Sequence, residues 1–97
     1  MQGEDDRAIA DFDAAIKLNA KFAPAFFSRG LAEEDKGDFP RAIADFTAAI
    51  KLDPKMISAY DQRASAYEQT GAHDHALADI AEAVKLDPNN PDLHRLR

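Results

Sequence analysis

The stretch AIADFDAAIKL, from Ala8 to Leu18, decides the fold, because it recurs as AIADFTAAIKL at 42–52 and more loosely as ALADIAEAVKL at 76–86. Each copy begins 34 residues after the one before it. A fixed period of this length is typical of a solenoid of stacked helical units, none of which buries its apolar face alone. The sequence therefore predicts a repeat array.

Each copy has the apolar spacing of an amphipathic helix, and we interpret the three as the second helices of three repeats. First helices are expected over about residues 24–36 and 57–70. Within them the same shift aligns four pairs of residues: Phe26 with Tyr60, Arg29 with Arg63, Gly30 with Ala64, and Ala32 with Ala66.

Turn and cap residues mark the boundaries of these helices. Glycines at one offset, Gly3, Gly37 and Gly71, predict left-handed residues that each end a preceding helix. Asp38 is expected to cap the next helix, with Pro40 in its first turn, where the missing N–H loses no bond.

Prolines predict the remaining ends. The Asp-Pro pairs at 53–54 and 87–88 should stop the second helices, since a residue before proline avoids the α region. Asn90 and Pro91 predict the start of a short last helix that reaches Arg97.

The expected fold is an all-α, right-handed superhelix of antiparallel helix pairs, with about five helices and a short C-terminal helix. We expect one domain over 1–97 with four parts: the second half of a repeat (1–22), two full repeats (23–56 and 57–90), and the start of a truncated repeat or cap (91–97).

The offsets of small, large and proline residues resemble the tetratricopeptide repeat. The pattern runs through Phe26, Arg29, Gly30, Glu33, Ala42, Phe46 and Pro54, and again through Tyr60, Arg63, Ala64, Tyr67, Ala76, Ile80 and Pro88. The chain departs from it where Arg29 and Arg63 replace a leucine and Glu33 replaces a tyrosine. Because aspartates recur with the same period at 11, 45 and 79, we hypothesise that the two arginines pair with neighbouring aspartates.

The resemblance implies a non-catalytic module that binds a peptide or protein in a concave groove lined by its first helices. On this chain the groove residues would be Phe27, Leu31, Glu34, Asp35, Asp61, Gln62, Ser65 and Glu68. Because this surface is acidic with an apolar patch, the expected partner is basic or mixed basic and apolar. The same charge argues against the chaperone-tail binding known in part of the family. The alternative is that these are ordinary solvated helix residues.

Composition excludes several other classes of function. A net charge of −6 argues against nucleic acid, and no apolar run is long enough for a membrane span. The absence of cysteine and of a signal-like start fits a cytoplasmic protein. We expect no metal: the histidines are His73, His75 and His94, and the first two are two residues apart, on different helix faces. His73 should be a half-buried packing residue. No cofactor or catalytic site is expected.

The first repeat copy lacks the helix that would cover it, so Ile9, Phe12 and Ile16 should be partly exposed. Three kinds of cover are possible: a second copy of the chain, another protein, or more of a longer array. We expect self-association as a homodimer through this helix, as a structural alternative to groove binding.

Overall fold

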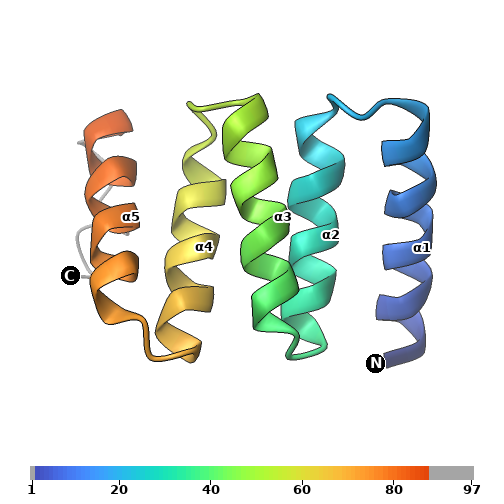
Figure 1. Ribbon diagram of the computed structural model, residues 1–97, viewed down its shortest axis with the longest axis horizontal. Helices are drawn as coiled ribbons and strands as arrows, with labels where there is room; N and C mark the ends of the chain where they lie inside the picture. Colours follow the sequence, from blue (N-terminus) through green and yellow to red (C-terminus); the bar gives the residue numbers. More distant parts are fainter. Residues whose placement is uncertain (1, 88–97) are drawn as a thin grey trace.

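The computed structural model of the chain describes residues 2–87, which form five helices joined by short turns (Figure 1). The helices are α1 (Gln2–Leu18), α2 (Ala23–Asp35), α3 (Phe39–Leu52), α4 (Ile57–Gln69) and α5 (His73–Leu86). Each packs against the next along the chain. The all-α array of antiparallel helix pairs is therefore confirmed, while the short helix expected at 91–97 lies outside the described residues.

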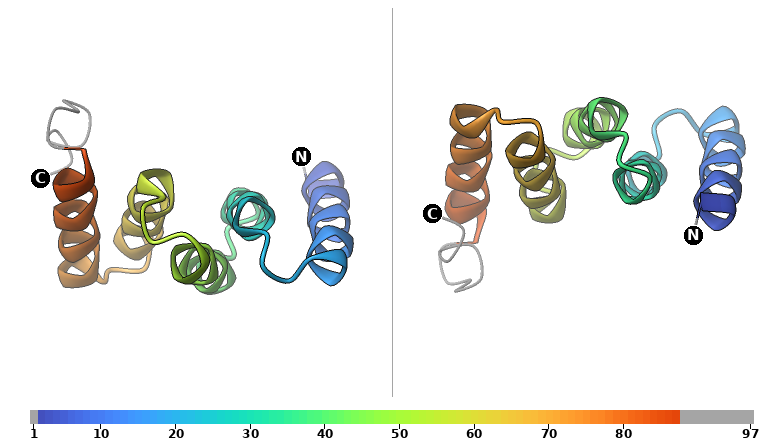
Figure 2. Two further views of the ribbon diagram at one scale, coloured as in Figure 1. Left: turned by 90° about the horizontal axis from the view of Figure 1, so that it is seen from above. Right: turned by 90° about the horizontal axis from the view of Figure 1, so that it is seen from below.

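The helices stand in a staggered row. The view from above shows α3 displaced to one side of α2 and α4, with α1 and α5 at opposite ends (Figure 2). The first helices α2 and α4 also contact each other directly. Among the described helices, α1 packs mainly against α2, so one long side of α1 has no helix against it.

Two of the three predicted turns are confirmed. Gly37 and Gly71 both have φ of +83°, the left-handed conformation that glycine adopts at low cost. The Asp38 side chain accepts a hydrogen bond from the N–H of Arg41, at 3.3 Å, and Pro40 lies in the first turn of α3. The second helices end at Leu52 and Leu86, as the Asp-Pro pairs predict.

The predicted turn at Gly3 is wrong. Gly3 lies inside α1, which begins at Gln2 and is therefore longer at its start than α3 and α5. A left-handed glycine is needed where one helix must end and reverse into another. Gly3 is followed by the continuous helix α1 and the chain does not reverse there, so the left-handed conformation is not required.

The core is built mostly from alanine, which allows the helices to approach closely. One buried cluster joins Ala42, Phe46 and Ala66, and a second joins Ala64, Ala76 and Ile80. Phe46 is the large side chain that is fully buried within the described part of the chain.

None of the described helices combines the length and the apolar character needed to cross a membrane.

Candidate functional site

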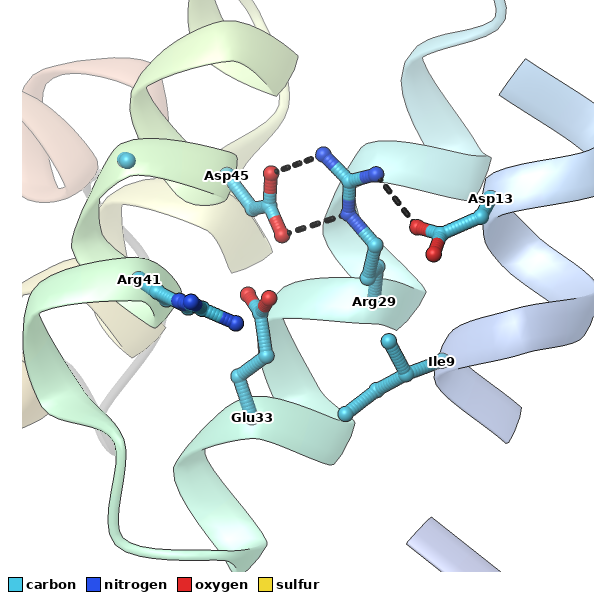
Figure 3. A pocket seen from close by; sticks show the side chains of 7 residues that line it. Ile9, Asp13, Arg29, Glu33, Arg41 and Asp45 are labelled. Atoms are coloured by element: carbon cyan, nitrogen blue, oxygen red, sulfur yellow. Dashed lines mark hydrogen bonds and ion pairs between the residues drawn. The ribbon is translucent and has the colours of Figure 1, made fainter. Parts of the chain in front are cut away.

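An arginine of the first full repeat ties together three consecutive helices, α1, α2 and α3 (Figure 3). Arg29 on α2 donates from Nε and Nη2 to the two carboxylate oxygens of Asp45 on α3, at 2.8 and 2.6 Å. Its Nη1 donates to Oδ1 of Asp13 on α1, at 2.7 Å. The hydrogen bonds to Asp45 are the main cause of a raised Arg29 pKa, so the guanidinium stays charged.

The second full repeat repeats this arrangement. Arg63 donates to both oxygens of Asp79, at 2.8 and 2.6 Å, and to the hydroxyl oxygen of Thr47, at 3.1 Å. Asp45 and Asp79 are only 5% and 4% exposed, so the paired arginines are what offset the burial of their charges. The hypothesised pairing is confirmed, whereas Asp11, at the same register position in α1, is exposed.

Beside each ion pair a small residue lies against a large one. A Cβ placed on Gly30 would come within 2.6 Å of the Phe46 ring, so that ring packs directly on the α2 backbone. One repeat later Ala64 and the smaller Ile80 share a buried cluster. We call the combination the repeat contact: an arginine followed by a small residue, packed against an aspartate followed by a large apolar residue.

A cavity of about 320 Å³ lies next to Arg29, between α1, α2 and α3 (Figure 3). It is lined by Ile9, Asp13, Arg29, Glu33, Arg41, Ala44 and Asp45. Glu33 is 6% exposed, and its Oε1 is buried without a hydrogen-bond partner in the described structure. Burial, and then the neighbouring Asp45 carboxylate, raise the pKa of Glu33 to about 8.

Glu33 lines this cavity at a position that holds an aromatic residue one repeat later. The counterparts of Glu33 and Arg41 in the next repeat are Tyr67 and His75, whose rings stack at 5.1 Å. The departure from the usual tyrosine, visible in the sequence, therefore places a buried carboxyl group beside the cavity.

The predicted groove residues of α2 are divided between the core and the surface. Phe27 and Leu31 are half-buried and pack against the cluster around Phe46, with the Phe27 and Phe46 rings 5.7 Å apart. Glu34 is half-buried, and its pKa is raised by burial and then by the exposed Asp35. The α2 part of the surface is therefore acidic at its C-terminal end.

The predicted groove residues of α4 are more polar. Asp61 and Gln62 are half-buried, while Ser65 and Glu68 are exposed and help to line a hollow of about 230 Å³ next to α5. Oε2 of Glu68 lies 2.7 Å from Nδ1 of His73. The structure thus places the eight predicted residues on two neighbouring helices.

The α1 residues predicted to self-associate do not all point the same way. Ile9 lines the cavity next to Arg29, on the side of α1 that packs against α2. Phe12 is the register counterpart of Phe46, which is fully buried between helices, yet Phe12 itself is only half-buried. Ile16 is also half-buried.

The uncovered side of α1 follows from its register with α3. Four residues of α3 are buried against the helices beside them: Ala42, Asp45, Phe46 and Ala49. Their counterparts in α1 are Ala8, Asp11, Phe12 and Ala15, which are exposed or half-buried. We call these four the α1 outer face; sequence reasoning missed Asp11 in it, although the 34-residue period contained the signal.

The histidines do not form a metal site in the described structure. His73 was expected to be half-buried; this is wrong, because it is exposed and interacts with Glu68. It lies in the first turn of α5, where its side chain reaches out towards α4 instead of into the core. The described residues contain no group of three histidine, cysteine or acidic side chains placed to hold a metal ion; His94 lies outside them.

Comparisons with known protein families agree with the 34-residue repeat. Two family models, both described as tetratricopeptide repeat, match the chain over residues 2–57 and 57–97. No curated protein sequence matches it.

Solved structures share the fold. The TPR domain of Arabidopsis OM64 superposes with a TM-score of 0.90 at 30% identity, covering 96% of this chain and 77% of that one. The structure of MamA superposes with a TM-score of 0.86 at 30% identity and covers 88% of this chain. This chain spans only 50% of the length of MamA. The first TPR of Spaghetti (RPAP3), solved bound to the HSP90 peptide SRMEEVD, shows the same fold, with a TM-score of 0.92 at 23% identity. The match covers 98% of this chain and 75% of that one.

Proposed function

The chain belongs to the tetratricopeptide repeat family, and from this we propose that it is a non-catalytic module that binds a peptide or protein through α2 and α4. The observation that carries the proposal is the set of predicted groove residues on two first helices that contact each other. Such a surface can receive an extended or helical segment along both helices.

The charge of this surface favours a basic partner. Glu34 and Asp35 on α2 and Asp61 and Glu68 on α4 supply four carboxyl groups. Burial and the neighbouring Asp35 already oppose ionisation of Glu34, as its raised pKa indicates. A lysine or arginine brought to this surface would favour the charged form of Glu34, so the surface is complementary to a cationic segment.

An acidic peptide should be rejected. The peptide held by the Spaghetti (RPAP3) domain, SRMEEVD, carries three acidic residues. Placing such a segment beside Glu34, Asp35 and Glu68 would bring like charges together without a cation between them. We therefore propose a partner that is basic or that alternates basic and apolar residues, with the exposed edges of Phe27 and Leu31 receiving the apolar ones.

Fluorescence anisotropy with two labelled peptide panels of equal length tests this proposal. One panel combines lysine or arginine with leucine, and the other combines glutamate with leucine. Binding should be confined to the basic panel, should weaken with salt, and should fall by about tenfold or more in Glu34→Lys/Asp35→Lys. Asp74→Lys/Glu82→Lys on α5 makes the same charge change elsewhere and should bind normally.

Two results would overturn groove binding. One is equal binding of both panels, which would mean that the charge of the surface does not select the partner. The other is an equal loss of binding in the α5 control, which would place the effect in the overall charge of the chain.

A second candidate function is self-association through α1, as a homodimer. It is supported by Phe12, which is half-buried while its counterpart Phe46 is fully buried. Exposed apolar surface of this kind is stabilised when a partner covers it. Light scattering should show a dimer for the wild-type chain and a monomer for Phe12→Glu; a wild-type chain that is already monomeric contradicts the proposal.

A further inference from the structure

The α1 helix carries both halves of the repeat contact. In the full repeats the first helix supplies an arginine and a small residue, as in Arg63–Ala64, and the second supplies an aspartate and a large apolar residue, as in Asp79–Ile80. In α1 the first half is Arg7–Ala8 and the second half is Asp11–Phe12. One helix therefore contains two complementary elements that elsewhere lie on two helices.

Both elements lie on the same side of α1. Residues 7, 8, 11 and 12 are one turn apart in pairs, so their side chains share one side of the helix. Ala8, Asp11 and Phe12 belong to the α1 outer face, and Arg7 extends it at one edge. Arg7 and Asp11 are exposed and form no ion pair with any described residue.

We propose that two copies of this chain pair through α1, antiparallel about a two-fold axis, with Arg7–Ala8 of each copy packed on Asp11–Phe12 of the other. The proposal rests on the self-association suggested above and names the contact that forms it. The partner is a second copy because Arg7 and Asp11 lie on one side of each α1, at the spacing that an antiparallel copy complements.

The order of residues fits the geometry seen inside the chain. In the antiparallel pair α2 and α3, Arg29 meets Asp45 and the next residue of each, Gly30 and Phe46, also meet. Antiparallel α1 helices that bring Arg7 onto the partner's Asp11 also bring Ala8 onto the partner's Phe12. The two-fold axis then produces the same contact a second time.

The size of the facing residues sets the distance between the two helices. Phe46 packs directly against Gly30, where a Cβ would lie only 2.6 Å from the ring. Ala8 has that Cβ, so two α1 helices carrying Phe12 must pack slightly farther apart than α2 and α3. In the second full repeat an alanine occupies this position opposite the smaller Ile80.

Charge exchange between two variants tests the contact directly. Arg7→Asp leaves only acids at the two positions, and Asp11→Arg leaves only bases, so each variant alone should self-associate at least about tenfold more weakly than wild type. Mixed in equal amounts, they should form a heterodimer whose affinity is within about threefold of the wild-type homodimer. Sedimentation equilibrium measures all three species.

A matched control separates this contact from overall charge. Lys17→Asp makes the same change in net charge as Arg7→Asp, in the last turn of α1, outside the proposed contact. It should leave the dimer unchanged, and circular dichroism should show that all variants keep the helical content of wild type.

The outcomes distinguish the contact from self-association itself. A wild-type chain that stays monomeric at the concentrations tested overturns both. A wild-type dimer that survives both single substitutions, or single variants that fail to recombine when mixed, overturns the Arg7–Asp11 contact and leaves self-association through another surface. Peptide binding by α2 and α4 is measured separately and is affected by neither result.

Discussion

Arg63 and Asp79 are joined by two parallel hydrogen bonds of 2.8 and 2.6 Å, in the same geometry that Arg29 and Asp45 adopt one repeat earlier. The Arg63 guanidinium also lies 5.8 Å from the ring centres of Tyr60 and Tyr67. A buried ion pair of this kind fixes how two helices align, because each charge is stable there only when it faces the other. At the positions of Arg29 and Arg63 this ion pair replaces the packing of the leucine that is usual in the family.

Removing one member of the Arg63–Asp79 pair should destabilise the fold. Arg63→Leu leaves the Asp79 carboxylate almost fully buried without its partner, and we expect the free energy of unfolding to fall by about 3 kcal/mol. Adding Asp79→Leu removes the stranded charge and should recover most of the loss. Urea denaturation of the single and double variants measures both values; a single variant as stable as wild type would contradict the role given to the pair.

Gly30→Ala should destabilise the first full repeat, although alanine is the better helix former. The new methyl group would meet the buried Phe46 ring, and overpacking of this kind costs about 1–3 kcal/mol, against a gain of up to about 1 kcal/mol from helix propensity. Combining it with Phe46→Ile reproduces the Ala64 and Ile80 pair and should restore stability relative to Gly30→Ala. Thermal unfolding followed by circular dichroism tests the order of the three proteins.

Stability should fall as the pH rises from about 5 to 8, because of Glu33. Its pKa is near 8 in the folded chain and 4.5 in its ordinary state, so between these values the folded chain binds the proton that the unfolded chain has lost. The contribution of Glu33 to stability is complete below pH 4.5, the pKa in the unfolded chain, and is lost as the pH rises through about 8, the pKa in the folded chain. The wild-type profile minus that of Glu33→Gln isolates this effect; a flat difference would contradict it.

Glu33→Tyr should stabilise the chain. The ring would occupy the cavity of about 320 Å³ and would remove the buried oxygen that lacks a hydrogen-bond partner. We expect a gain of about 1–2 kcal/mol at neutral pH, in the range of other cavity-filling changes. Adding Arg41→His reproduces the Tyr67 and His75 stack of the next repeat. Thermal unfolding measures the gain, and a lower midpoint for Glu33→Tyr would show that the cavity cannot accept the ring.

Much of the fold could be predicted because the relevant interactions repeat at a fixed spacing. The period of 34 residues aligned Arg29 with Arg63 and Asp45 with Asp79, and this was enough to predict that the two arginines pair with neighbouring aspartates. The cap at Asp38 depends on residues next to it in the chain, so it too was visible in the sequence.

The prediction failed where the repeats lack a neighbour or differ from one another. Gly3 has the sequence of a turn, but no described helix ends there, so it is helical. His73 shares the register of Phe39, yet it reaches Glu68 at the surface instead of packing inside. In both cases the same position has different surroundings in different repeats.

The sequence by itself determined the period, the helix pairs and the pairing of the two arginines with aspartates, because these depend on spacing along one chain. The tertiary structure alone decided that Ile9 faces the cavity whereas Asp11 and Phe12 belong to the uncovered side of α1, and that Glu33 is buried beside open space. The physical reason is that burial depends on which helices pack on either side of a residue, and α1 has its described neighbour on one side.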